Sequence, residues 1–304
     1  MHTSPIADDS SKPSYLSQAK QILKELEASP LKRLGQNFMI RQSALERVST
    51  QIKASQQDLI IEIGPGLGFL TEHLAQNKSP NTPLIAIELD KKYANYLMDQ
   101  FSDRTDVTIF HQDIMKFDFE QQIQSILGHD PKPHSISLIG NIPYQISSPL
   151  LDIVLKYRLW WSEVYFTVQK DFAKRLVTLP GNRDCGAISV WVGLNADCKI
   201  ICDFPGDFFY PRPKVKSSLI QILPKPVSEM GFDANESQSI DECIHSAFGH
   251  RRKTLSNSLL KPDIGWDKAK VCEALEQCSI PAQTRAEALS AEKWICLGKA
   301  LMIE

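Results

Sequence analysis

Short apolar runs alternate with helical patterns through the middle of the chain. Four runs have the length and branched composition of buried strands, and a helical pattern follows each: residues 59–63, 84–87, 107–110 and 136–139. Strands that alternate with helices are typical of a parallel sheet with helices on both faces. The pattern predicts an α/β fold with a doubly wound, mostly parallel sheet, with further strands at residues 164–168, 199–202 and 217–223.

The two ends of the chain carry helical patterns only. Residues 15–29 have an apolar stripe at helical spacing, which predicts an amphipathic helix within an N-terminal extension, residues 1–30. The main domain is expected at residues 31–224, followed by a polar linker formed by residues 224–226 and then 231–239. The remainder, residues 225–304, predicts a small helical domain, with helical patterns at residues 240–248, 255–260, 268–277 and 292–302.

Two short motifs indicate where helices begin. Ser43-Ala44-Leu45-Glu46 has the spacing of a capping box, in which the serine oxygen and the glutamate carboxylate accept from free backbone N–H groups. Ser148-Pro149 places a capping serine before a proline in the first turn. We therefore expect one helix to start at each motif.

The composition is that of a globular protein. Of 304 residues 42% are hydrophobic, but no stretch approaches the roughly 18 apolar residues of a membrane span. The start of the chain is polar, with Asp8 and Asp9, so a cytoplasmic location is expected. The seven cysteines contain no Cys-x-x-Cys pair, which predicts reduced thiols and no metal site.

The net charge of −2 does not suit a protein that coats nucleic acid indiscriminately. Any binding of RNA or DNA has to use local basic patches. Each patch alone is more often a solvated surface than a binding site. The candidates are Lys32-Arg33, Arg212 with Lys214 and Lys216, and Arg251-Arg252-Lys253.

Three glycines, Gly64, Gly66 and Gly68, follow the first predicted strand at every second position. Glycine lets the backbone approach a ligand closely, but the dinucleotide fingerprint requires a third glycine where Phe69 stands. Glu62 precedes the glycines and would repel a phosphate while tolerating a cationic sulfonium or ammonium. The loop therefore argues against a pyrophosphate ligand.

Carboxylates end the next two predicted strands. Glu88 lies about 20 residues beyond Gly68, where an acidic residue can accept from two ribose hydroxyls. Asp113 ends the third strand and can accept from an adenine amine. Each carboxylate singly is more often a loop cap, but together they fit S-adenosylmethionine, a nucleoside cofactor without phosphate groups.

Asn141-Ile142-Pro143-Tyr144 ends the fourth predicted strand. The Asn141 side-chain oxygen and the Ile142 carbonyl offer two uncharged acceptors, Pro143 gives a rigid turn, and Tyr144 offers a stacking face. This set suits the amine of a flipped-out base, which has to be oriented rather than deprotonated.

Five motifs in a fixed order carry a family resemblance. They are Lys32-Arg33-Leu34-Gly35-Gln36-Asn37-Phe38, Glu62-Ile63-Gly64-Pro65-Gly66, Glu88-Leu89-Asp90, Gly140-Asn141-Ile142-Pro143-Tyr144 and Arg251-Arg252-Lys253-Thr254. The chain resembles the ribosomal RNA adenine dimethyltransferases, specifically the small-subunit enzymes, from about residue 30 to its C-terminus.

The resemblance implies a class I methyltransferase domain, Rossmann-like, with a small helical RNA-binding domain. The implied reaction moves methyl groups from S-adenosylmethionine to two adjacent adenines in a hairpin loop near the 3′ end of 16S rRNA. The products would be N6,N6-dimethyladenosines and S-adenosylhomocysteine. The implied partner is small-subunit rRNA in the assembling 30S subunit, and we expect a monomer.

The resemblance also assigns roles to residues. Phe209 is expected on the face of the base opposite Tyr144, although core packing explains a lone phenylalanine equally well. Cys185 stands where an aromatic residue is expected. With Glu62 and Gly66, the implied cofactor residues are Asn37, Met39, Gly64, Glu88, Asp113 and Asn141; Met39 and Ile142 each replace a usual leucine. RNA contacts are expected from Lys32, Arg33, Arg212, Lys214, Arg251, Arg252 and Lys253.

The sequence is also compatible with other functions. A large-subunit rRNA adenine methyltransferase shares these motifs, and a DNA adenine methyltransferase uses a similar Asn-Pro-Pro-Tyr motif. The chain can also act mainly as a ribosome assembly factor, with methylation secondary. A nicotinamide dehydrogenase is disfavoured by Phe69 and by the lack of a catalytic histidine arrangement.

Overall fold

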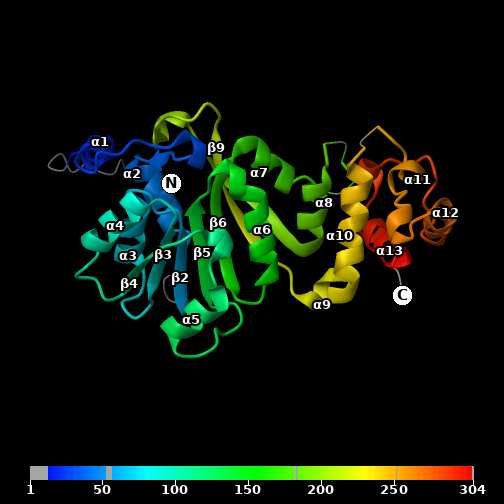
Figure 1. The fold of residues 1–304 in the computed structure, drawn as a ribbon, viewed down its shortest axis with the longest axis horizontal. Coiled ribbons are helices and arrows are strands. Elements are labelled where there is room, and N and C mark those ends of the chain that lie inside the picture. The colour runs from blue at the N-terminus through cyan, green and yellow to red at the C-terminus, as the bar shows by residue number, and fades with distance from the viewer. Residues whose placement is uncertain (1–12, 53–56, 180, 183, 251, 303–304) are drawn as a thin grey trace, which may run out of the picture.

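Seven strands form one sheet in the computed structural model, which describes residues 13–52, 57–179, 181–182, 184–250 and 252–302 (Figure 1). The strand order is β4-β3-β2-β5-β6-β9-β7. The first five strands in this order are parallel, and β9 is antiparallel to both neighbours. The predicted α/β fold and all seven predicted strands are confirmed. The strands are β2 Leu59–Ile63, β3 Leu84–Glu88, β4 Val107–His111, β5 Ile136–Asn141, β6 Trp161–Gln169, β7 Ala196–Phe204 and β9 Ser217–Pro224.

Helices cover both faces of the sheet, so β2 and β3 are buried along their whole length. Alternate strand residues supply two cores: Leu138 and Phe166 face one side, whereas Ile60 and Ile139 face the other. The first core lies under α5 Phe119–Leu127, α6 Ser147–Lys156 and α7 Lys170–Leu176. The second lies under α1 Tyr15–Glu25, α2 Gln42–Ser49, α3 Phe69–Asn77 and α4 Lys91–Gln100.

A third core joins the C-terminal helices to α8 (Ala187–Asn195). Val190 and Leu194 of α8, together with Cys185, pack into this core, while Val192 packs into the first sheet core. The third core therefore includes residues on both sides of position 224, and the domain boundary there stays a prediction. The C-terminal helices are α9 Val227–Met230, α10 Ala234–Phe248, α11 Leu255–Ser258, α12 Lys268–Gln277 and α13 Ala291–Ala300 (Figure 1).

Two short strands outside the main sheet were not predicted. β1 (Phe38–Met39) pairs antiparallel with β8 (Phe209–Tyr210), so that Met39 lies opposite Phe209. Two residues are too few to give a periodic signal in the sequence. The short 3₁₀ turns are η1 Lys32–Leu34, η3 Ile114–Lys116, η4 Tyr144–Ile146, η5 Gly206–Phe208, η6 Pro262–Ile264 and η7 Ala286–Ala288.

The two predicted helix starts need correction. The Ile40 N–H still bonds to the Phe208 carbonyl at 2.8 Å, and α2 follows directly with Arg41 as its N-cap. Ser43 therefore lies inside α2, and the capping-box prediction is wrong. α6 begins at Ser147, so Ser148 is not the cap, although the following proline lies in the first turn as predicted.

The predicted linker also contains helices. α9 lies between its two parts, and α10 begins at residue 234, within the second part. The start of α10 is a capping box that the sequence analysis missed. The Asp233 carboxylate accepts from the Glu236 N–H at 2.9 Å, and the Glu236 carboxylate accepts from the Asp233 N–H at 2.9 Å.

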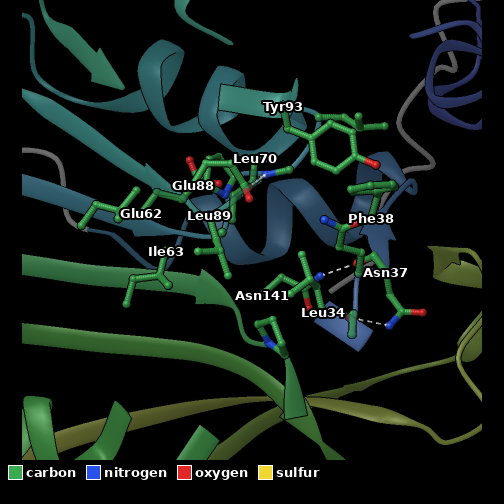
Figure 2. A pocket seen from close by; sticks show the side chains of 18 of the residues that line it. Leu34, Asn37, Phe38, Glu62, Ile63, Leu70, Glu88, Leu89, Tyr93 and Asn141 are labelled. Carbon is green, nitrogen blue, oxygen red and sulfur yellow. Dashed lines mark hydrogen bonds between the residues drawn. The ribbon is translucent and has the colours of Figure 1, made fainter. Parts of the chain in front are cut away.

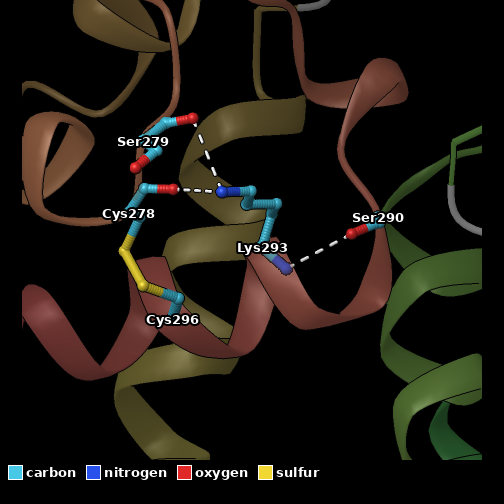
Figure 3. Close-up of a disulfide and its surroundings, with 5 residues drawn as sticks. All are labelled: Cys278, Ser279, Ser290, Lys293 and Cys296. Carbon is cyan, nitrogen blue, oxygen red and sulfur yellow. Dashed lines mark hydrogen bonds between the residues drawn. A yellow bond between two sulfur atoms is a disulfide. The ribbon is translucent and has the colours of Figure 1, made fainter.

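A disulfide joins Cys278 and Cys296 (Figure 3), so the prediction of reduced thiols is wrong for this pair. The residues are 18 positions apart, but the packing of α12 against α13 brings their Cα atoms to 5.8 Å, within bonding range. Lys293 supports the same corner by donating to the carbonyls of Cys278 and Ser279. Cys198, Cys202, Cys243 and Cys272 are free thiols.

We expect this disulfide to stabilise the C-terminal helices. It closes a short loop, for which restriction of the unfolded chain gives roughly 3 kcal/mol. The double variant Cys278→Ser with Cys296→Ser should lose about 2–4 kcal/mol in the free energy of unfolding, measured by urea denaturation. A reductant should lower the stability of the original chain and leave that of the variant unchanged; titration of seven free thiols in the untreated chain would contradict the bond.

Candidate active site

A pocket opens where the carboxyl ends of β2, β3 and β5 meet (Figure 2). This edge is where open parallel sheets bind their ligands. Strand ends supply one side of the lining, and the segment around β1 crosses the other. All of the residues predicted to bind the cofactor line this pocket: Asn37, Met39, Glu62, Gly64, Gly66, Glu88, Asp113 and Asn141.

The glycine loop after β2 needs its glycines for backbone shape and for space. Gly64 and Gly66 have φ values of 66° and 58°, a region that side-chain-bearing residues rarely adopt. A Cβ atom on Gly66 would lie 2.8 Å from the ring of Phe38. The loop can therefore pass under β1 and still leave the pocket open.

Glu88 ends β3 with its carboxylate held by two backbone groups. One oxygen accepts from the Gly66 N–H at 2.9 Å, and the other accepts from the Asp90 N–H at 2.8 Å. Burial raises the pKa of Glu88, while these two N–H groups favour its charged form. Each oxygen retains a lone pair, which is the arrangement needed to accept from a diol.

Glu62 is the more deeply buried acid, with 1% of its surface exposed. Its Oε2 atom has no hydrogen-bond partner among the described residues. Burial raises the pKa of Glu62 to about 8, and the nearby Glu88 adds to the increase. A cationic ligand would compensate an ionised Glu62, because a buried carboxylate is strongly disfavoured until it is paired.

Asn141 is oriented by the segment that crosses the pocket (Figure 2). Its Nδ2 donates to the Asn37 carbonyl at 2.6 Å, and the Asn37 side chain in turn donates to the Gly35 carbonyl at 2.8 Å. A carbonyl requires a donor, so this contact fixes which end of the Asn141 amide is the NH₂ group. The Oδ1 atom is therefore placed at the opposite end as an acceptor.

The turn after Asn141 is also fixed by the backbone. The Ile142 N–H donates to the Thr167 carbonyl on β6 at 3.0 Å, and the Ile142 side chain is buried. The Pro143 carbonyl accepts from the Ile146 N–H at 3.2 Å and from the Ser147 hydroxyl at 3.2 Å. The Ile142 N–H and the Pro143 carbonyl, on either side of the Ile142 carbonyl, are both hydrogen-bonded. The Ile142 carbonyl therefore has a defined direction as an acceptor.

Asp113 and Met39 complete the lining. One oxygen of Asp113 accepts from the Met115 N–H at 3.0 Å, which caps η3. The loop-cap reading of Asp113 is therefore correct, while its position in the lining keeps it available to a ligand. Met39 is buried and lines the pocket, and its volume is similar to that of the usual leucine.

Comparison with known proteins identifies the family. The family described as "Ribosomal RNA adenine dimethylase" matches residues 29–300. The chain belongs to this family. The "Ribosomal RNA small subunit methyltransferase A" of Lachnoclostridium phytofermentans is 32% identical over 289 residues, covering 93% of this chain and 97% of that protein.

Solved structures agree with this fold. A dimethyladenosine transferase from Plasmodium falciparum has a TM-score of 0.67 at 22% identity, covering 84% of this chain and 94% of that one. The 23S rRNA methyltransferase ErmE has a TM-score of 0.62 at 18% identity, covering 87% and 99%. At these identities the likeness shows the class I methyltransferase fold and does not separate the two rRNA targets.

S-adenosylmethionine is the cofactor of the chain, and the pocket suits the chemistry of this cofactor. The Glu88 carboxylate matches the ribose diol, the unpaired oxygen of Glu62 matches a cationic group, and Asp113 lies where an adenine amine can reach it. The cofactor supplies a methyl group on a positively charged sulfur. Individual contacts of these residues stay predictions.

The residues predicted to hold the substrate base lie in two places. Asn141 and Pro143 line the pocket, and Tyr144 follows them at the start of η4. Phe209 is 3% exposed and packs in the second sheet core near Phe204, with ring centroids 6.4 Å apart. Its predicted stacking role requires β8 to move or the base to reach beneath it, and it stays a prediction.

The predicted RNA contacts fall into three separate regions. Arg33 is exposed in η1, next to the pocket-lining Leu34, with Lys32 in the same turn. Arg212 and Lys214 are exposed in the loop after β8, and Arg252 and Lys253 are exposed between α10 and α11. Figure 1 shows α10 and α11 in the opposite half of the molecule from β2 and β3, whose ends line the pocket. Arg251 lies outside the described residues.

Tyr93 and Gln36 are among the pocket residues that were given no role from the sequence. Tyr93 on α4 is buried against Phe38, with ring centroids 5.5 Å apart in an edge-to-face arrangement. Gln36 donates to Asp90 at 3.3 Å and accepts from the Leu31 N–H at 2.7 Å. Gln36 lies within a motif that the sequence analysis recognised, whereas nothing around Tyr93 distinguishes it before the fold is known.

The raised pKa of Glu62 predicts a pH-dependent stability. Between pH 4.5 and about 8 the folded protein keeps a proton on Glu62 that the unfolded chain releases. The free energy of unfolding should therefore fall with rising pH in this window, by up to about 1.4 kcal/mol per pH unit from this group, and level off above it. Glu62→Gln should remove that part of the slope in urea denaturation from pH 5 to 8.5, whereas the exposed Glu120→Gln should not. Equal slopes in the original chain and Glu62→Gln would contradict the prediction.

The orientation of Asn141 predicts a strong effect of Asn141→Asp. A carboxylate has no hydrogen to donate to the Asn37 carbonyl, and its charge would stabilise the sulfonium before transfer. We expect kcat for methyl transfer to fall at least 100-fold, measured with saturating cofactor. Asn235→Asp, which adds the same charge at an exposed position of α10, should retain full activity. A loss of less than tenfold at Asn141 would show that the amide hydrogen bond does not matter.

Proposed function

We propose that the chain transfers methyl groups from S-adenosylmethionine to the exocyclic amines of two adjacent adenines in small-subunit rRNA. The target would be a hairpin loop near the 3′ end of 16S rRNA, and the product N6,N6-dimethyladenosine. The observation that supports the proposal is the fixed orientation of the Asn141 amide in the lining of the cofactor pocket. The chain also belongs to the adenine dimethylase family. The match to a relative named as a small-subunit methyltransferase supports the choice of subunit.

Neutral acceptors suit this reaction. An adenine amine is a weak nucleophile because its lone pair is delocalised into the ring, and it is too weakly acidic for a side chain to deprotonate first. Asn141 Oδ1 and the Ile142 carbonyl would each accept one amine hydrogen, which turns the nitrogen lone pair toward the methyl group. The fixed directions of both acceptors then contribute through positioning.

The second methylation sets a geometric demand. After the first transfer the nitrogen carries one hydrogen, so only one of the two acceptors can be used. The pocket must then hold a methyl group where the second hydrogen was. The uncharged surroundings of Pro143 and Ile146 in the lining suit that methyl group.

The substrate subunit gives the direct test. Radiolabelled S-adenosylmethionine should label undermethylated small subunits, and nucleoside analysis should find N6,N6-dimethyladenosine. Purified large subunits serve as the matched control, because a large-subunit enzyme uses the same site. Labelling confined to the large subunit, or a monomethyl product only, would contradict the proposal.

The basic residues after α10 provide a second test. Arg252→Glu with Lys253→Glu should weaken binding to small-subunit rRNA and reduce the slope of log affinity against log salt by about one per lost phosphate contact. Lys268→Glu with Lys270→Glu on α12 makes the same charge change within the same group of helices. Binding curves at several salt concentrations should separate the two variants; identical salt slopes would remove Arg252 and Lys253 from the RNA interface.

The proposal also includes the oligomeric state, the partner and the cellular location. The chain would act as a monomer on the assembling 30S subunit in the cytoplasm. No helix in the parts of the chain that the structure describes combines the length and apolar composition needed to span a membrane.

A further inference from the structure

The N-terminal helix α1 lies behind the cofactor pocket although it precedes the residues that match the family, 29–300. Ala19 and Leu23 are buried in the second sheet core, which also contains the pocket residues Phe38 and Leu70. Figure 1 shows α1 in dark blue at the end of the molecule that holds α2, α3 and α4. No role for this helix follows from the reaction described above.

The first contact of α1 is with the wall of the pocket. The Tyr15 ring lies 4.9 Å from the ring of Phe69, and the Tyr15 hydroxyl lies 2.9 Å from Nε2 of His73. Phe69 is the first residue of α3 and lines the pocket directly after the glycine loop. Tyr15 therefore supports this wall from the side opposite the cofactor.

The second contact is with the strand end that carries Glu88. Lys92 Nζ donates to the carbonyls of Leu26 and Glu27, at 3.2 and 2.7 Å, where the charge of lysine also suits the negative end of α1. Lys92 lies in the first turn of α4, where its N–H donates to Asp90. The Asp90 N–H in turn donates to Glu88, so α1 is linked to the Glu88 carboxylate through one turn of backbone.

Between these two contacts, a second cavity separates α1 from the glycine loop. Gln18 and Ile22 on α1 line this cavity, whose opposite side includes Leu67, Gly68 and Phe69. Leu67 and Phe69 line both cavities, so the glycine loop is a thin partition. Leu97 of α4 packs against the loop at Gly68, where a Cβ atom would lie 2.5 Å from its side chain, whereas the contacts of α1 lie at the two flanks of the loop.

We propose that α1 is a positioning element for S-adenosylmethionine, acting through Tyr15 on Phe69 and through Lys92 on the segment after Glu88. The helix keeps the two flanks of the glycine loop in the conformation that binds the cofactor. This role rests on the cofactor and does not depend on which RNA is methylated. Tyr15 and Lys92 are positioning residues, because neither lines the pocket.

The test measures cofactor affinity apart from catalysis. Tyr15→Ala and Lys92→Met in the full chain should each raise the Kd for S-adenosylmethionine at least fivefold by titration calorimetry. The kcat at saturating cofactor should stay within twofold. Tyr15→Phe keeps the ring contact with Phe69 and should recover most of the affinity lost in Tyr15→Ala.

Two matched controls identify the contacts. Lys91→Met changes the exposed neighbouring residue of α4 in the same way as Lys92→Met, and Lys20→Ala changes an exposed residue of α1; both should leave Kd within twofold. Amide exchange at residues 66–70 and 88–92 should accelerate in Tyr15→Ala and Lys92→Met and be restored by the cofactor. An unchanged Kd in both variants, or a fall in kcat with Kd unchanged, would overturn the proposal even if the variants unfold at lower temperature.

Discussion

The site depends on two carboxyl groups, Glu62 and Glu88, that are buried on neighbouring strands at one edge of the sheet. Glu88 has two backbone N–H groups directed at it, whereas one oxygen of Glu62 has no partner among the described residues. A buried carboxyl in that condition keeps a proton or attracts a cation. The pocket thus favours a ligand with a positive charge, which can compensate an ionised Glu62, over a ligand with phosphates.

The segment around β1 completes the other half of the pocket from a distant part of the sequence. Its pairing with β8 places Asn37 where its carbonyl meets Asn141, 104 residues later. Phe38 fills the space above Gly66 that any side chain there would occupy. The cofactor pocket and the proposed base site therefore share one support, so a change in β1 or β8 would affect both of them.

Much of the architecture was predictable because its strands are buried on both faces and read as continuous apolar runs. The position of the pocket was also predictable, because the carboxyl ends of neighbouring parallel strands lie together on one side of the sheet. Local patterns were weaker guides. Ser43 has the spacing of a cap, but the pairing of Ile40 with Phe208 determines where α2 begins. Cys278 and Cys296 have no signal in their spacing, because only the packing of α12 on α13 brings them together.

Residues outside recognised motifs were predictable only in part. Tyr93 has no local distinction, since its position over the pocket results from the path of α4. Phe209 was assigned to the base by resemblance, yet burial in the core is what its sequence neighbours also suggest. Arg252 and Lys253 were recognisable in the sequence as basic residues. Their distance from the pocket was not predictable, because it depends on how α8 joins the two parts of the chain.

The way α8 joins the sheet to the C-terminal helices would affect which RNA the protein can bind. α8 contributes Val192 to the core of the sheet and Val190 and Leu194 to the core of the C-terminal helices. A helix shared by two cores resists hinge motion between them, unlike a flexible linker. The basic residues after α10 and the proposed base site at Asn141 are then held at a constant separation. An RNA that contacts both proposed sites would have to match that separation with its own shape, so the fold would measure length in the substrate as well as recognise its bases.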